Sequence, residues 1–274
     1  MTEGGPVARH GEGNGKDPAE PMIIAQISDT HIETASATAS ARLGDLERTV
    51  EAINALSPRP VAVLHTGDVA HDASPGDYAA ARGVLGRLAC PVYAIVGNRD
   101  RRLAFNVAFG PDGYLEHGSG FVQYAVDLGP VRLVAAVTLD DTSALGGFCA
   151  ARAAGLTRLL DGTKGKPALV FLHHPPVALP DLKGPAVQFR DEAEAAVLTR
   201  CIGEQPDVIG VVAGHVHRAR AAALGGALGG ALGGAQGTVM LSTMPAIAAD
   251  LNREKLPAGH AGRPVFHLHR IRGR

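Results

Sequence analysis

Short apolar segments that each end in a polar cluster are the feature of this sequence that most restricts its fold. The first three of these segments are Met22–Ser28, Val61–Thr66 and Pro91–Val96. Each is short and rich in valine, isoleucine and other apolar residues. This pattern is typical of strands that are buried on both faces of a sheet, as in α/β proteins. We therefore predict that the three segments are neighbouring central strands.

The stretches between these strands predict helices. Apolar residues recur at helical spacing on one side of the first stretch, at Leu43, Leu46, Val50, Ile53 and Leu56. A second helix is predicted over Asp77–Ala89, although Gly83 and Gly86 weaken it. The resulting β-α-β-α-β order favours parallel strands. Their carboxyl ends then meet at one edge of the sheet, where α/β proteins bind ligands.

The rest of the chain predicts a hairpin, two more helices and four more strands. The antiparallel hairpin joins Phe121–Leu128 to Val131–Leu139 across Gly129 and Pro130. The other elements are helices at Gly155–Asp161 and Asp191–Ile202 and strands at Ala168–Leu172, Asp207–Val212, Thr238–Leu241 and Val265–His269. Because no linker rich in Pro and Ser divides the chain, residues 22–274 are predicted to form one domain.

Two segments of biased composition are predicted to lie outside the regular elements. Residues 1–21 are rich in Gly, Pro and charge and lack the apolar centre of a signal peptide, so we expect a disordered leader. Ala-Leu-Gly-Gly repeats within residues 223–235, which indicates a flexible loop insertion. A lid or a contact surface is the alternative for this loop.

The charge balance argues against polymeric and membrane partners. The chain has 26 basic and 27 acidic residues, so no basic field is available for nucleic acid. No apolar run approaches the roughly 20 residues that a membrane-spanning helix needs. The cysteines, Cys90, Cys149 and Cys201, are too widely spaced to indicate a disulfide framework, and they suggest a reducing, cytoplasmic location.

Metal-ligand residue types stand at the predicted strand ends. They are Asp29, His31, Asp68, Asn98, His173, His215 and His217. Carboxylate, imidazole and amide groups bind hard and borderline metals, and two-metal phosphoesterases hold their ions about 3.5–4 Å apart. We expect strand alternation to direct Asp29 and His31 to one side, and Asp68 to bridge two ions. Glycines at 67, 97 and 214 are expected to allow sharp turns beside the ligands.

Five motifs carry a family resemblance when they are taken in this order: QISDTHI (26–32), TGD (66–68), GNRD (97–100), HHPP (173–176) and GHVH (214–217). The set resembles the calcineurin-like metallophosphoesterases, most closely the bacterial class III cyclic nucleotide phosphodiesterases. The resemblance implies an α/β fold, a four-layer α-β-β-α sandwich of two mixed sheets flanked by helices. It also implies two ions of iron, manganese or zinc. One would be held by Asp29, His31, Asp68 and His217, and the other by Asp68, Asn98, His173 and His215.

The sequence departs from that group at Arg99, where the group usually has histidine. Arginine stays protonated and cannot serve as a general acid, but it can hold phosphate oxygens with two hydrogen bonds. We therefore expect Arg99 to clamp the phosphate and Asp100 to orient Arg99 or a metal ligand. Asn98 and His71 are further candidates for substrate contact. The Gly-Asn-Arg-Asp motif is similar to that of the UDP-diacylglucosamine pyrophosphohydrolases, whereas QISDTHI and HHPP argue against that branch.

The resemblance implies a phosphodiesterase in which a metal-bridging hydroxide attacks a small diester, such as a cyclic nucleotide or a glycerophosphodiester. A pyrophosphohydrolase or phosphomonoesterase with the same metals is the alternative enzyme. A non-catalytic scaffold is disfavoured because every expected ligand is present. A homodimer is common in the family, although the sequence shows no interface. His65 and His174 are expected to support the ligands or the core.

Overall fold

The computed structural model of the chain describes residues 21–115, 120–182, 184–224, 233–234, 237–254 and 263–271. The predicted leader therefore lies outside the described residues apart from Pro21, as does most of the Ala-Leu-Gly-Gly segment. Within the described ranges, none of the helices combines the length and the apolar character that a bilayer crossing requires.

The first half of the molecule is a four-stranded sheet with three helices. The sheet has the order β12-β1-β2-β3, in which β1–β3 are parallel and β12 runs antiparallel to β1. The strands are β1 (Met22–Ile27), β2 (Ala62–His65), β3 (Val92–Ala94) and β12 (His267–Ile271). The helices are α1 (Ala39–Asn54), α2 (Pro75–Leu85) and α3 (Arg102–Phe109), followed by a 3₁₀ turn η1 (Gly110–Asp112).

The second half is a six-stranded mixed sheet of order β4-β5-β6-β7-β11-β8. Its strands are β4 (Tyr124–Leu128), β5 (Val131–Ala135), β6 (Ala168–Phe171), β7 (Val208–Ala213), β8 (Arg220–Ala223) and β11 (Met240–Thr243). Helices α4 (Ala150–Asp161) and α5 (Glu192–Gly203) belong to this half. A small ribbon pairs β9 (Gly233–Gly234) with β10 (Gly237–Thr238).

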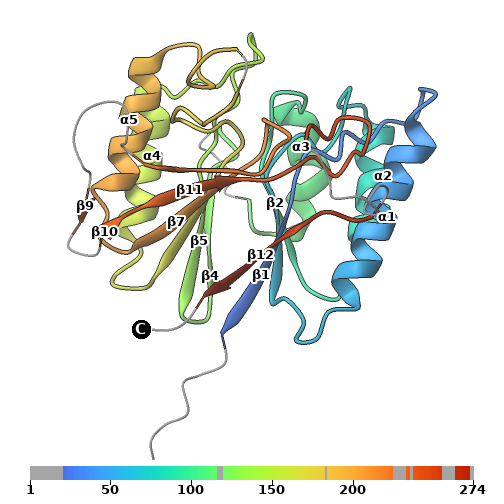
Figure 1. Cartoon of the computed structure of the whole chain (residues 1–274), viewed down its shortest axis with the longest axis horizontal. Coiled ribbons are helices and arrows are strands. Elements are labelled where there is room, and N and C mark those ends of the chain that lie inside the picture. The colour runs from blue at the N-terminus through green and yellow to red at the C-terminus, as the bar shows by residue number, and fades with distance from the viewer. Residues whose placement is uncertain are drawn as a thin grey trace, which may run out of the picture.

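The two sheets lie face to face between two layers of helices. Figure 1 shows α1, α2 and α3 on one side and α4 and α5 on the other, with both sheets between them. One buried cluster joins the first sheet and its helices to the inner face of the second sheet, including Tyr124, Leu133 and Phe171. A second cluster, which includes Leu156 and Leu198, lies between the second sheet and α4 and α5. The predicted four-layer α/β architecture is confirmed.

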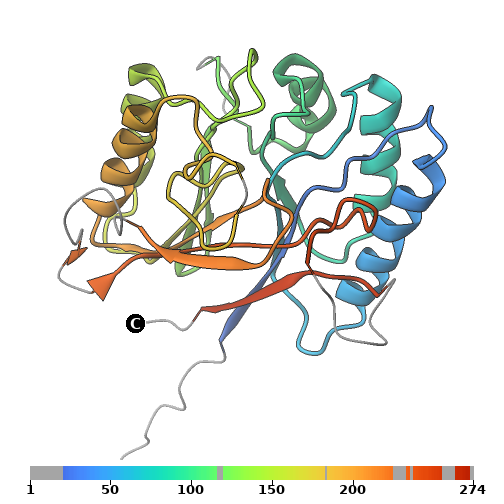
Figure 2. The ribbon, with the colours of Figure 1, turned by 45° about the horizontal axis from the view of Figure 1, so that its top comes forward.

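The carboxyl ends of the parallel strands lie at the same edge of the molecule. Strands β1, β2, β6 and β7 all end there, and Figure 2 shows the loops that leave this edge gathered between the two groups of helices. Helix α2 starts at the same edge with a capping box between Ser74 and Asp77. This edge is where the polar motifs meet, and we call it the motif edge.

Several predicted boundaries were wrong. Helix α4 begins at Ala150 rather than Gly155, because its first turns are mostly alanine, which favours helix without an apolar period. Strand β5 ends at Ala135 rather than Leu139, since the chain there leaves the sheet for the motif edge. The strand expected at Thr238–Leu241 corresponds to β11, which spans Met240–Thr243 instead. Strand β8 was not expected, because its sequence Arg-Ala-Ala-Ala lacks β-branched residues.

Candidate metal centre

Five of the seven candidate ligands lie on left-handed rather than extended backbone. Asp29, His31, Asp68, His215 and His217 all have positive φ, between 44° and 71°. The expectation that strand alternation aligns Asp29 with His31 was therefore wrong, although both side chains do face the same point. Left-handed backbone is unfavourable for residues other than glycine and is concentrated at functional sites.

Hydrogen bonds between neighbouring loops hold this twisted backbone in place. Asp29 N donates to Gly67 O at 3.0 Å, and His31 N donates to Asp68 O at 3.0 Å. The Thr30 hydroxyl donates to Val69 O at 2.9 Å. The loops after β1 and β2 therefore form one unit that fixes the first three candidate ligands.

The first group of candidate ligands comprises Asp29, His31, Asp68 and His217. His217 Nε2 lies 3.2 Å from Asp29 Oδ1, and His31 Nε2 lies 3.9 Å from the same oxygen. His31 Nε2 is also 3.4 Å from Asp68 Oδ2. The ligand atoms of Asp29, His31 and His217 all lie within 4.8 Å of one another, close enough to share one ion.

The second group comprises Asp68, Asn98, His173 and His215. His173 Nε2 lies 3.5 Å from Asp68 Oδ1 and 3.1 Å from Asn98 Oδ1. His215 Nδ1 lies 3.0 Å from the same Asn98 oxygen. Asp68 therefore directs one carboxylate oxygen at each group, as a bridging ligand would.

The donor atoms in these groups fit a metal. His31 Nε2 is buried and has no hydrogen-bond partner in the described part of the chain. In His173 and His217 the other ring nitrogen, Nδ1, is engaged by a backbone carbonyl, Thr66 O at 2.8 Å and Leu251 O at 3.0 Å respectively. Metal-binding histidines commonly use one nitrogen this way, which leaves the other free for the ion. Imidazole and carboxylate donors in this combination suit zinc, iron and manganese.

The pKa values of the clustered carboxyl and imidazole groups are shifted by burial and by one another. Burial opposes ionisation of Asp29, but the nearby His217 outweighs it and lowers the pKa of Asp29. Burial and the Asp29 charge together raise the pKa of Asp68 to about 8. Burial lowers the pKa of His31 and that of His215 to about 3. Neutral imidazoles beside crowded carboxylates are a favourable setting for cations.

Two of the glycines beside the ligands provide space rather than a turn. Only Gly67 has positive φ, at 98°, so the expected turn role holds there alone. A Cβ on Gly97 would lie 2.7 Å from His173 Cε1 and closer still to Asp68. A Cβ on Gly214 would lie 2.8 Å from Asp29 Oδ2. The loops approach one another so closely that a side chain at either position would displace a candidate ligand.

Asp100 is fully buried and contacts backbone rather than the Arg99 side chain. Its carboxylate accepts hydrogen bonds from the backbone N–H groups of Val69, Ala70 and Gly97 at 2.9–3.2 Å. It also accepts one from the Tyr78 hydroxyl at 2.8 Å. Asp100 therefore ties the loop that carries Asp68 to the loop that carries Asn98.

Arg99 and His71 lie at the exposed side of the cluster. The Arg99 side chain is exposed, while its backbone N–H donates to Asp68 Oδ1 at 2.7 Å. His71 Nδ1 lies 3.3 Å from His31 Nδ1, and the two rings are 5.4 Å apart. Both residues border the cluster on the side where a substrate could approach.

His65 and His174, which were expected to support the ligands or the core, are both fully buried and hydrogen-bonded. His65 Nε2 lies 3.0 Å from the Thr30 hydroxyl. His174 Nδ1 lies 2.8 Å from the Thr138 hydroxyl, and its Nε2 lies 3.2 Å from Ala144 O. His174 nonetheless lies within metal-ligating distance of His173 and His215, a proximity that the sequence did not predict.

Sequence reasoning missed a segment after β11 that encloses the first group. Ile247 N donates to Ser28 O, and Arg253 N donates to His217 O. The buried guanidinium of Arg42 binds Asp250 at 2.8 Å and donates to His31 O at 3.2 Å. No motif marks this segment, and only the amphipathic position of Arg42 on α1 could have suggested a buried charge.

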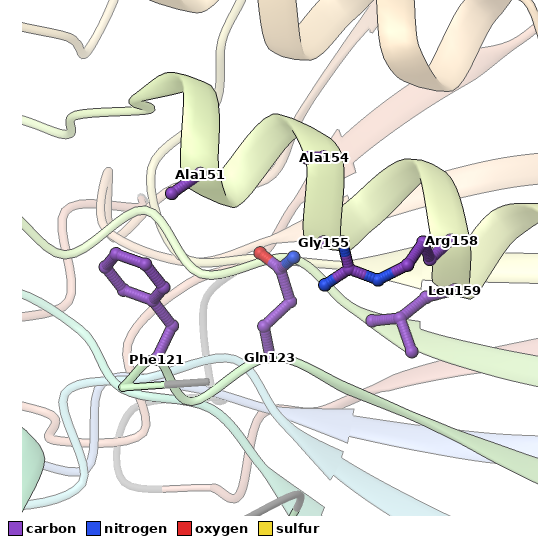
Figure 3. A pocket seen from close by; sticks show the side chains of 7 residues that line it. All are labelled: Phe121, Gln123, Ala151, Ala154, Gly155, Arg158 and Leu159. Atoms are coloured by element: carbon purple, nitrogen blue, oxygen red, sulfur yellow. The ribbon is translucent and has the colours of Figure 1, made fainter. Parts of the chain in front are cut away.

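A cavity of about 490 Å³ lies elsewhere, between α4 and the chain entering β4. Figure 3 shows Phe121 and Gln123 facing Arg158 and the small residues of α4 across it. It is lined by Phe121, Gln123, Ala151, Ala154, Gly155, Arg158 and Leu159. None of these side chains is a carboxylate or an imidazole, so this cavity is not a second metal-type site.

The fold and the cluster together define a metal-dependent hydrolase of the α-β-β-α type. A family model of calcineurin-like phosphoesterases matches residues 22–219, and the chain belongs to that family.

Curated relatives support the same assignment. A probable glycerophosphodiester phosphodiesterase of Arcobacter nitrofigilis is 26% identical over 72% of both chains. A probable cyclic nucleotide phosphodiesterase of a Synechococcus strain is 28% identical over 87% of this chain and 85% of that protein. Among solved structures, a dimetal phosphatase from Danio rerio shares the fold, with a TM-score of 0.67 at 14% identity over 93% of this chain and 94% of that one.

Proposed function

We propose that the chain is a dinuclear metal-dependent phosphodiesterase acting on small diesters. The position of Asp68 carries this proposal, because its two oxygens lie 3.4 and 3.5 Å from histidine nitrogens of different groups. One metal would be held by Asp29, His31, Asp68 and His217, and the other by Asp68, Asn98, His173 and His215. Metal-loading experiments on the stripped protein decide which of iron, manganese and zinc the two sites bind.

When bound, the metals lower the pKa of a water molecule and neutralise charge on the phosphate oxygens. The chain's own contribution is geometric. The Asp100 carboxylate fixes the two loops that carry Asp68 and Asn98. Arg99 is free to turn toward the phosphate and to hold its oxygens through two N–H groups as negative charge builds up. Water at the exposed side protonates the departing alcohol, since Arg99 cannot.

Small diesters are the proposed substrates, with cyclic nucleotides and glycerophosphodiesters as the first candidates. The names of the curated relatives support both classes. The balanced charge favours a small molecule over a nucleic-acid polymer. A cytoplasmic location is proposed because a reducing compartment suits three free thiols. A homodimer is proposed from the family resemblance alone.

The test is hydrolysis of bis(p-nitrophenyl) phosphate, p-nitrophenyl phosphate and 2′,3′- and 3′,5′-cyclic AMP by metal-stripped protein with and without manganese. Asp68→Asn serves as the control because it keeps the shape of the side chain. Metal-dependent cleavage of diesters that the control loses would support the proposal. If two metals bind but no diester is cleaved, the Gly-Asn-Arg-Asp motif makes a pyrophosphohydrolase the better assignment.

The Arg99 clamp has its own test. Arg99→Ala should lower kcat by about 100- to 1,000-fold, as expected when one group that binds transition-state charge is removed. Metal content should not change, because the Arg99 side chain is exposed and only its backbone contacts a candidate ligand. Elemental analysis of the purified variant checks this, and a loss of metal would contradict the assignment.

A further inference from the structure

The candidate metal centre opens to solvent over its second group of ligands. Of the seven candidate ligands, only Asn98 and His215 are partly exposed, whereas the other five are buried. Arg99 follows Asn98 directly, and its side chain is exposed. The positive charge of Arg99 counters part of the rise in the pKa of Asp68 that burial and Asp29 cause. The opening is therefore bordered by one arginine from the first half of the molecule.

The segment after β11 brings a second arginine to the same opening. His217 Nδ1 lies 3.0 Å from Leu251 O, and Arg253 N donates to His217 O at 3.0 Å. These two contacts attach residues 251–253 to a candidate ligand, and the side chain of Arg253 is exposed. Burial, together with the charges of His173, His217 and Arg253, lowers the pKa of His215 to about 3. The Arg253 guanidinium therefore lies near the partly exposed His215 ring.

The carboxylates beside Arg253 in the chain are bound to other partners. Asp250 is paired with Arg42 at 2.8 Å. Glu254 is paired with Arg220 at 3.1 Å. Within the described part of the chain, none of the carboxylates forms an ion pair with Arg253. The Arg253 guanidinium can therefore hold an anion from outside the protein through two parallel N–H bonds.

We propose that Arg253 binds a second anionic group of the substrate, so that the enzyme favours small phosphodiesters that also carry a carboxylate or a further phosphate. This inference rests on the proposed phosphodiesterase function. A phosphodiester carries a single negative charge, which the two metals and Arg99 already match. Arg99 stands beside Asn98 and Arg253 beside His215, so the two guanidinium groups approach the opening from different halves. A substrate with two anionic groups would use both arginines.

The first experiment compares phenyl p-nitrophenyl phosphate with p-carboxyphenyl p-nitrophenyl phosphate, using manganese-loaded full-length protein. In both diesters, water adds its hydroxyl to phosphorus and its proton to the departing p-nitrophenolate as the same P–O bond breaks, so only the retained group differs. The carboxylated diester should have a KM about 10-fold lower, because hydrogen bonds between charged groups are stronger than neutral ones. Arg253→Gln should remove this difference, and Arg253→Lys should keep part of it, since lysine keeps the charge but not the paired N–H groups.

Arg59→Gln is the matched control. It removes the same charge from an exposed arginine between α1 and β2, before the amino end of β2 and away from the motif edge, and it should keep the full difference in KM. A wild-type protein that cleaves both diesters with the same KM would overturn the proposal. If Arg253→Gln raises KM equally for both diesters, the residue binds the cleaved phosphate, which would also overturn it.

Binding of phenylphosphonate and p-carboxyphenylphosphonate, which have no ester bond to hydrolyse, separates this inference from the proposed function. Calorimetry on the manganese-loaded protein should give a Kd about 10-fold lower for the carboxylated compound. The difference should be lost in Arg253→Gln and kept in Arg59→Gln. If the diesters are not cleaved but this difference is found, the phosphodiesterase function fails and the anion site at Arg253 stands. Equal Kd values in the wild-type protein would overturn the anion site, whatever the diesters show.

Discussion

The two halves of the molecule supply different chemistry to the metal centre. The first half carries the candidate oxygen ligands Asp29, Asp68 and Asn98 and one candidate imidazole ligand, His31. The candidate ligands of the second half are all imidazoles, His173, His215 and His217, which follow β6 and β7. The site therefore exists only where the two halves meet, and neither set of residues resembles a complete centre by itself.

The halves also differ in how their ligands are held. In the first half, backbone hydrogen bonds and the buried Asp100 carboxylate fix the loops to one another. In the second half, the imidazoles depend on partners elsewhere: His173 on Thr66 O across the sheets, and His217 on Leu251 O. The first half is thus a rigid frame, whereas the second half is oriented by contact with it.

Filling the space beside Gly97, where the two halves meet, should have the largest effect on metal binding and stability. Gly97→Ala should abolish metal binding and lower the free energy of unfolding by about 3 kcal/mol or more, because its Cβ would overlap Asp68 and His173. Metal content and chemical denaturation measure both effects. Gly83→Ala is the control, since nothing lies within 4 Å of a Cβ there and alanine should stabilise α2 slightly. A Gly97→Ala protein with normal metal content would show that the halves can separate.

Loosening the segment after β11 should have the next largest effect. Arg42→Ala leaves Glu33 and the carbonyl of His31 without their buried cationic partner. Unfolding free energy should fall by about 2–3 kcal/mol, and metal affinity should also fall because Asp250 adjoins Leu251. Arg48→Ala, on the same helix, removes the pair between the half-exposed Arg48 side chain and Asp45 and should cost less than about 1 kcal/mol. Equal losses in the two variants would remove any special role for Arg42.

A smaller effect, on the pH dependence of stability, should come from the hydrogen bonds of Gln26 that join the two sheets. Gln26 donates to Ala213 O in the second sheet, and His269 Nε2 donates to Gln26 Oε1 at 2.9 Å. Burial lowers the pKa of His269 from 6.5 to about 4, so the unfolded chain takes up this proton more readily. Stability is therefore unaffected above pH 6.5 and declines as the pH falls toward 4.

Between pH 7.5 and 5 this histidine should lower the unfolding free energy by about 1–2 kcal/mol. His269→Gln keeps a donor near Gln26 but cannot titrate, so its stability should depend less on pH by that amount. Urea unfolding of metal-free protein at both pH values measures the difference. Parallel curves for the two proteins would place the acid sensitivity at other groups.

The architecture and the clustering of the candidate ligands could both be predicted from the sequence, because both depend on where the buried strands end. Strands such as β1 and β2 are buried and rich in Val and Ile, so their positions follow from composition, and the polar motifs follow them directly. Parallel connection then brings their ends to one edge. Strand β8 and the start of α4 were missed because alanine-rich segments carry no apolar period.

The local geometry of the site was beyond sequence reasoning. The positive φ of Asp29 and His31 is imposed by bonds to Gly67 and Asp68, which lie nearly 40 residues away. Likewise, Asp100 was expected to orient Arg99 or a ligand, but its backbone contacts became visible only when the loops after β2 and β3 were placed together. Such contacts depend on tertiary structure and leave no periodic signal.

The pairing of β12 with β1 has a consequence for the order of events during synthesis. Met22 is opposite Ile271 and Gln26 is opposite His267, so the first described strand of the fold is paired with the last one. Until residues 267–271 leave the ribosome, β1 is an open edge that other chains could extend. Nascent chains stalled shortly before this point should therefore require a chaperone, whereas chains released after it should close the edge unaided.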